Sequence, residues 1–318
     1  KQNNIMDMTE GNITKQLMLF SVPMLLGNLF QQLYNLVDSV VVGRVVGPNA
    51  LAAIGATGSV TFLFIALCNG MGSGGGIVVS QKFGAKDETG VRKSLTNAAY
   101  LMMGMAVIVC VISYLLTPTI LTLLKTPSDI ISDAISYMRM MCLGLPLVAI
   151  YNYSSFMLRA LGDSRGPLYF LIVSCLINVV LDILFVKVLG MSVFGAALAT
   201  VISQFIAGAG CIVYSVKTNE FFRLSREDYN TDKKIVYDTV RLGVPMSLQF
   251  SMIAISCMGL QAVVNSFGSV AVAAFTATSR IEQLVHQPYT SLGTALATFT
   301  GQNYGARQDS RIKEGFKK

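Results

Sequence analysis

Charged residues are scarce in this chain of 318 residues, in which Asp, Glu, Lys and Arg together make up 13%. Soluble domains carry roughly 25% charged residues, so the composition argues against an ordinary soluble fold. Hydrophobic residues reach 53%, and long uncharged stretches recur along the chain. These features predict a protein embedded in a lipid bilayer.

Histidine and closely spaced cysteines are also lacking, because the chain has one histidine, His286, and six isolated cysteines. Each cysteine falls in a different apolar run, so the spacing predicts neither a disulfide framework nor a zinc site. We interpret the cysteines as small buried hydrophobic residues. Because no metal-spaced cluster or nucleophile–base pair is found, we expect no enzymatic activity and no cofactor.

Eight apolar runs are long enough to cross a bilayer as helices. The sustained alternation that marks barrel strands is missing. The predicted fold is therefore all-α, a polytopic bundle of transmembrane helices. The expected spans are 15–46, 50–82, 94–124, 130–158, 166–188, 190–217, 236–266 and 269–304.

Basic residues gather in alternate loops, which hold most of the 24 Lys and Arg residues. The positive-inside rule then predicts a multi-pass plasma-membrane protein whose N-terminus and polar 217–241 segment are cytoplasmic. This distribution explains the net charge of +7 without a nucleic-acid partner.

An internal repeat divides the chain. Ser21-Val-Pro-Met-Leu25 matches Gly243-Val-Pro-Met-Ser247, and Gln81-Lys-Phe-Gly-Ala85 matches Gln302-Asn-Tyr-Gly-Ala306. Six predicted helices separate the copies, so both copies enter the membrane from the same side, as parallel repeats do. We therefore expect a fragment of a twelve-helix protein. Its parts are a six-helix lobe at 1–216, a cytoplasmic linker at 217–241 and the first two helices of a second lobe at 242–318.

Glycine is concentrated between Gly70 and Gly76, where the sequence formally contains G-x-G-x-x-G. A dinucleotide site needs a preceding strand, whereas this run lies inside an uncharged helical stretch. The second copy keeps small residues there, so close helix packing is the expected role.

Two aspartates, Asp38 and Asp182, interrupt the apolar runs of the first lobe. An ionised carboxylate at membrane depth costs about 2.5–3.5 kcal/mol, which makes each aspartate a candidate functional group. Asn178 lies one helical turn before Asp182 and shares its face. Two alternatives stay open, in which Asp38 pairs with Arg44 and Asp182 pairs with Lys187 near its helix end.

Other oxygen-bearing side chains accompany these aspartates. Gln31, Tyr34 and Asn35 are spaced to share one helix face with Asp38, and Thr200 lies on the sixth predicted helix. Carboxylate, amide and hydroxyl oxygens are the groups that a hard cation or a proton needs. The set therefore predicts a site for one or the other.

The motifs together resemble those of the multidrug and toxic compound extrusion (MATE) family, and the resemblance covers the whole chain. They are Pro23, Gln31-x-x-Tyr34-Asn35-x-x-Asp38, Leu158-Arg-Ala-Leu-Gly-Asp163, and Asn178-x-x-x-Asp182 followed by Thr200. The resemblance implies two six-helix lobes around a central cavity. It also implies exchange of Na⁺ or H⁺ for organic, often cationic, small molecules by alternating access. We expect a monomer in the bilayer.

The resemblance also implies residue roles. The cation site, for Na⁺ or H⁺, would comprise Asp38, Asn178, Asp182 and Thr200, with Asn152 as a further candidate. The cavity-lining residues would be Gln31, Tyr34, Asn35, Gln249, Glu282 and His286. Pro23 would be the hinge of the first helix. Arg159 to Asp163 is interpreted as a structural loop, in which Asp163 caps the fifth helix.

Helix seven departs from the family pattern, because Leu242–Ser279 has no acidic residue, and ion coupling is therefore expected to rest on the first lobe. Glu282 and His286 share a helix face, and we expect them to bind substrate or a proton. The alternative is that Glu282 only forms a local pair with Arg280. The alternative function is a lipid-linked oligosaccharide flippase of the wider superfamily. Such a protein needs cationic groups for a pyrophosphate, whereas the first-lobe spans carry only Arg139.

Overall fold

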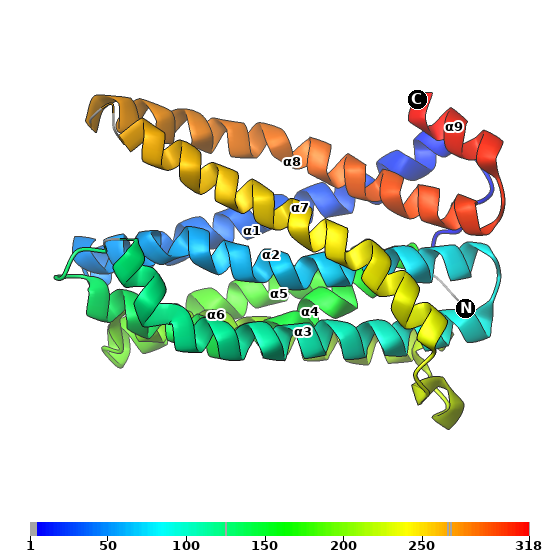
Figure 1. Ribbon diagram of the computed structural model, residues 1–318, viewed down its shortest axis with the longest axis horizontal. Helices are drawn as coiled ribbons and strands as arrows, with labels where there is room; N and C mark the ends of the chain where they lie inside the picture. The colour runs from blue at the N-terminus through cyan, green and yellow to red at the C-terminus, as the bar shows by residue number, and fades with distance from the viewer. Residues whose placement is uncertain (1–4, 125, 266, 268, 318) are drawn as a thin grey trace.

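The computed structural model of the chain is a bundle of long helices (Figure 1). It describes residues 5–124, 126–265, 267 and 269–317, without the side chains of 261, 262, 265, 269–273, 276, 277 and 280. The long helices are α1 (Ile13–Val45), α2 (Pro48–Gly84), α3 (Glu88–Leu123), α4 (Ile131–Ala160), α5 (Arg165–Asp182), α6 (Ser192–Thr218), α7 (Lys233–Asn265) and α8 (Ser269–Gly305). The short ones are η1 (Ile183–Val188), η2 (Glu220–Phe222), η3 (Arg226–Tyr229) and α9 (Asp309–Lys317).

The predicted all-helical fold is confirmed, since the described residues contain helices and no strand. Seven segments are long and apolar enough to span a membrane: α1 to α4, α5 with η1, α6, and the Lys233–Leu260 part of α7. The eighth predicted span forms α8, which has 37 residues but is less apolar over its described part.

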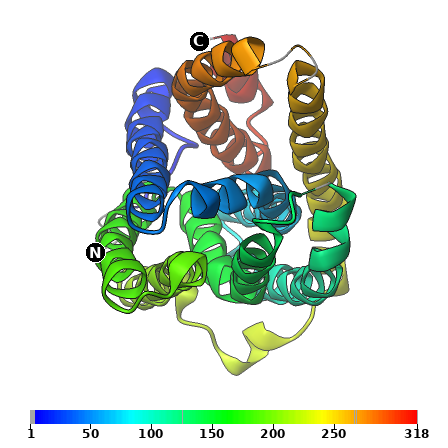
Figure 2. The ribbon, with the colours of Figure 1, turned by 90° about the vertical axis from the view of Figure 1, so that its left-hand side faces the viewer.

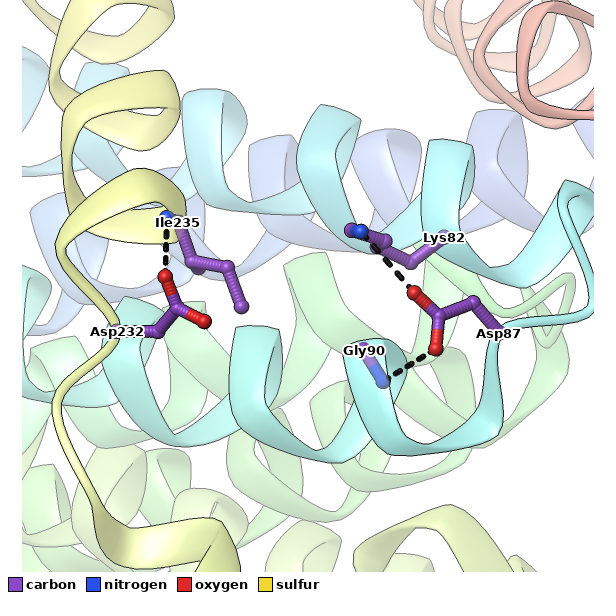
Figure 3. Close-up of polar contacts among 5 residues, drawn as sticks. All are labelled: Lys82, Asp87, Gly90, Asp232 and Ile235. Carbon is purple, nitrogen blue, oxygen red and sulfur yellow. Dashed lines mark hydrogen bonds and ion pairs between the residues drawn. The ribbon is translucent and has the colours of Figure 1, made fainter.

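Two aspartates fix the starts of α3 and α7 (Figure 3). Oδ1 of Asp87 accepts the N–H of Gly90 at 2.9 Å, and its Oδ2 lies 3.0 Å from Nζ of Lys82. Asp232 accepts the N–H of Ile235 at 3.2 Å. Partial burial raises the pKa of Asp87, but the Gly90 amide and the Lys82 charge outweigh it and hold the pKa below its usual range. Both caps satisfy amides that a helix start leaves unpaired.

The first six helices pack on one another. α2 lies against α3 and α4, α4 lies against α6, and α5 lies against α6 and α1. Outside this group, α7 packs along α2, while α8 packs along α1 and α2. Figure 2 shows α7 and α8 as separate arms on one side of the bundle.

Glycines allow the arms to approach α2 closely. The two copies of the repeat, 81–85 and 302–306, pack directly against each other. A Cβ on Gly84 would collide with the carbonyl oxygen of Gln302, and a Cβ on Gly305 would collide with the carbonyl oxygen of Gln81. Farther along α2, a Cβ on Gly74 would lie 2.5 Å from Cα of Gly243. The prediction that the 70–76 run serves helix packing is confirmed.

Replacing Gly74 with alanine should lower the free energy of unfolding by about 1–3 kcal/mol, because the backbone of α7 cannot yield to the new methyl group. The matched control is Gly104→Ala in α3, where a Cβ meets nothing within 4 Å. The control should be neutral or gain up to about 1 kcal/mol from helix propensity. Thermal unfolding in detergent compares the two, and equal stability would contradict the packing role.

The segment before α1 joins α8 to the end of α4. The N–H of Met8 donates to Oε1 of Gln302 at 2.8 Å, and the amide of Asn303 donates to the carbonyl of Met8 at 3.1 Å. The N–H of Met6 donates to the carbonyl of Gly162 at 3.3 Å. The segment before α1 therefore connects this end of the six-helix group to α8 through hydrogen bonds on both sides.

Candidate cation site between α1, α5 and α6

Two carboxyl groups from different helices meet inside the bundle. Asp38 lies on α1 and is 8% exposed, whereas Asp182 is the last residue of α5 and is fully buried. The two groups lie close enough for the charge of Asp38 to act on Asp182. Two unprotonated carboxylates would both be acceptors, and their charges would repel each other at close range.

Several buried polar atoms around this pair have no partner in the described part of the chain. They are Oδ1 of Asp38, both carboxylate oxygens of Asp182, and both amide atoms of Asn178, which is fully buried. An unsatisfied buried polar group costs about 1–3 kcal/mol. Such a cluster is therefore expected to bind a cation or a proton, whose charge the carboxylates and the amide oxygen would balance.

Hydroxyl groups complete the wall of the site. The buried phenol of Tyr34 on α1 donates to Oγ1 of Thr200 on α6 at 3.0 Å, which joins these helices beside the carboxyl pair. Tyr137 on α4 is also buried and lies close enough for its hydroxyl to sense the charges of Asp38 and Asp182. The sequence prediction did not include Tyr137, because an aromatic residue in an apolar helix is ordinarily a core residue.

The helix changes its winding directly after Asp182. Residues Ile183–Val188 form a π-helical turn, η1, in which the N–H of Leu189 donates to the carbonyl of Leu184 at 2.9 Å. A π-turn widens the helix and is common at functional sites. No sequence signal predicted it, because five of its six residues are ordinary apolar residues of a membrane helix.

The two simple pairings considered from the sequence are not formed. Arg44 and Lys187 are both exposed. The ion pair that the structure describes joins Lys82 to Asp87 and involves neither buried aspartate. Within the described residues, neither Asp38 nor Asp182 therefore has a basic side chain as an ion-pair partner.

The other predicted residues of the first lobe lie elsewhere. Gln31, Asn152 and Pro23 line a cavity of about 180 Å³ between α1, α4 and α5. No hydrogen bond within the described residues joins Asn152 to either aspartate of the pair. Asn35 shares the helix with Tyr34 but is exposed.

The predicted residues on α7 and α8 stand apart from the pair. Gln249 is exposed beside an apolar hollow on α7, and Glu282 and His286 are exposed on α8. Nδ1 of His286 lies 3.0 Å from Oγ1 of Thr290 one turn away. The suggested partner of Glu282, Arg280, has a side chain outside the described residues.

The chemistry of the pair suits a hard monovalent cation or a proton. All the candidate ligands are oxygens, which Na⁺ accepts and which soft metals do not prefer. Nowhere in the described ranges do three or more His, Cys, Asp or Glu side chains gather as a transition-metal site would need. Side chains from α1, α5 and α6 contribute together, so occupancy of the site can change how these helices pack.

Sequence comparisons relate the chain to known transporters. The chain matches the MatE family over residues 23–184 and 245–318. It is 32% identical over 307 residues to the Probable multidrug resistance protein YpnP of Bacillus subtilis (strain 168), covering 96% of the chain and 68% of that protein. It is 33% identical over 315 residues to YoeA, the Probable multidrug resistance protein of the same organism, with the same coverage.

Solved structures share the fold. One is described as "Reverse polarity of binding pocket suggests different function of a MOP superfamily transporter from Pyrococcus furiosus"; it matches with a TM-score of 0.91 and 27% identity over 98% of this chain and 69% of its own. Another, "Crystal structure of MATE in the bent conformation", matches with a TM-score of 0.84 and 29% identity over 97% and 69%. The chain therefore belongs to the MATE family of efflux transporters.

Proposed function

We propose that this chain is part of a cation-coupled multidrug antiporter, which exports organic, often cationic, compounds by alternating access in exchange for Na⁺ or H⁺. The observation that carries the proposal is the buried pair of Asp38 and Asp182, in which three of the four carboxylate oxygens have no hydrogen-bond partner among the described residues. Its relatives' names support drug compounds as the substrate class, since YpnP and YoeA are called probable multidrug resistance proteins.

The coupling follows from the charge of the pair. A cation entering from outside neutralises the carboxyl groups and draws in the oxygens of Asn178 and Thr200. Because these groups sit on α1, α5 and α6, binding changes the packing of three helices. Drug affinity falls as a result, since coupling needs only that the cation and the drug prefer different facing states. Pro23, inside α1, is the proposed hinge.

The gradient of the coupling cation supplies the energy, and the membrane potential adds to it when the exchange moves net charge. One charge moving through 100 mV provides about 2.3 kcal/mol, which is enough for roughly 40-fold accumulation of a neutral compound. In this proposal the protein is a plasma-membrane monomer, its N-terminus and the segment between α6 and α7 lie in the cytoplasm, and residues 1–216 form the first of two lobes. Nucleic acid has no role.

Reconstituted transporter tests the proposal directly. Proteoliposomes are loaded with ethidium and then given either a Na⁺ gradient or a pH gradient, with no other driving force. We expect one of the two gradients to move ethidium against its own concentration, and empty liposomes to move none. If neither gradient drives movement, the antiport mechanism is wrong.

A further inference from the structure

Arg159 is a cation inside the bundle with no acidic partner. It lies in the last turn of α4, where its Nε donates to the carbonyl of Ser155 at 3.0 Å and its guanidinium stacks on the ring of Phe156 at 5.0 Å. Its terminal nitrogens have no hydrogen-bond or ion-pair partner in the part of the chain that the structure describes. The carboxylate of the nearby Asp163 instead accepts hydrogen bonds from the backbone amides of Arg165 and Gly166 and from the hydroxyl of Tyr214.

A small cavity of about 40 Å³ opens beside Arg159, and its lining is more apolar than polar. Its wall combines three helices, with Ser73 and Ser80 from α2, Arg159 from α4 and Thr298 from α8 among its members. The rest of the wall is glycine, alanine, isoleucine, phenylalanine and a second threonine, and none of the lining residues is acidic. About 10–15 Å³ is enough to hold one water molecule, so a monatomic ion fits here with room left for a water.

The donors that face this cavity are suited to an anion. The hydroxyls of Ser73 and Thr298 have no protein partner among the described residues, and both can donate. Ser80 is different, because its single O–H is already shared between the carbonyls of Gly76 and Ala160. Together with the guanidinium, the two free hydroxyls provide a positive charge and neutral donors without a competing carboxylate. A half-buried cation in such a setting favours a counter-ion over water alone.

We propose that a small inorganic anion, chloride, binds in this cavity between Arg159, Ser73 and Thr298. Because α8 supplies one side, the site is complete only when α8 lies against the first six helices. Chloride then stabilises this closed arrangement. The proposal does not depend on cation coupling, since it involves neither Asp38 nor Asp182.

Thermal unfolding of the purified transporter, titrated from sodium gluconate into sodium chloride at constant Na⁺, tests the site. We expect a saturable rise of the melting temperature in the wild-type protein. The rise should vanish in Arg159→Gln and persist in Arg165→Gln, which removes an exposed arginine from the same end of the bundle. Constant Na⁺ keeps any effect of the coupling cation out of the comparison.

Thr298→Val preserves the shape of the buried threonine and should raise the half-saturating chloride concentration about tenfold, since a hydrogen bond to a charged group is lost. This variant keeps the test valid if Arg159→Gln does not fold. A bromide-soaked crystal should show an anomalous peak beside Arg159. The proposal is overturned if wild-type protein shows no saturable rise, if Arg159→Gln or Thr298→Val responds as the wild type does, or if bromide binds elsewhere.

Discussion

Asp38→Asn and Asp182→Asn should each reduce cation-driven ethidium efflux by about 100-fold or more. Each change leaves the side-chain shape nearly intact but removes one of the two carboxyl groups that hold the exchanged cation. Removing one partner of a buried charged interaction costs about 3–5 kcal/mol, and each 1.4 kcal/mol is a factor of ten. Efflux is measured in cells and in proteoliposomes at matched protein amounts.

The matched control is Asp129→Asn, which removes an exposed aspartate between α3 and α4. Its efflux should equal that of the wild type. If both variants of the buried pair transport as well as this control, the pair is not the coupling site, whatever the gradient used.

The second large effect concerns stability, and its sign distinguishes a functional site from a structural one. In sodium-free solution at neutral pH, Asp182→Asn should raise the free energy of unfolding by about 1–3 kcal/mol. The amide introduced at position 182 can donate to the carboxylate of Asp38, which satisfies oxygens that have no partner in the native pair. Functional sites commonly cost stability in this way.

Asp163→Asn is the matched contrast, since Asp163 is also buried but its oxygens accept three hydrogen bonds. This variant should lose about 1–2 kcal/mol, because charge-assisted bonds are weakened. Thermal unfolding of the two variants gives the comparison. A loss of stability in both would mean that Asp182, like Asp163, has a structural role.

Adding the coupling cation should increase the free energy of unfolding of the wild type more than that of Asp182→Asn. A ligand that binds only the folded state stabilises it by about 2.7 kcal/mol at 100 times its dissociation constant. The wild-type protein should therefore gain stability with Na⁺ or with acid, whichever is the coupling cation, while the variant gains little.

Spacing along single helices accounts for what the sequence could predict about the site. Asp38 and Asp182 stand out because charge is so rare in apolar runs, and helical periodicity places Asn178 and Tyr34 on the same faces as the aspartates. The cap on α5 was predicted in the same local way, and Asp163 does accept the amides of Arg165 and Gly166.

What the sequence could not predict depends on how helices pack. Tyr137 reaches the site because α4 packs against α6, which no pattern within α4 reveals. The π-turn at Ile183–Val188 is a local change of winding with no sequence signature. Asn35 shows that helical spacing alone does not establish burial, because it was predicted to share a helix face with Asp38 and yet is exposed.

Arg159 illustrates a further limit. Its motif was interpreted as a structural loop, and the loop is indeed held by Asp163. The cavity beside the guanidinium arises only because α8, more than 100 residues later in the chain, closes over α4. Local sequence cannot show that a charge lacks a partner in three dimensions.

The most direct test of the central claim is the affinity of the purified transporter for ethidium, measured by fluorescence across a range of Na⁺ concentrations and, separately, of pH. Coupling free energies of 1–3 kcal/mol predict that the coupling cation weakens ethidium binding by about 5- to 150-fold. The effect should be absent in Asp182→Asn. An ethidium affinity that ignores both cations in the wild type, or that responds equally in the variant, would contradict the account.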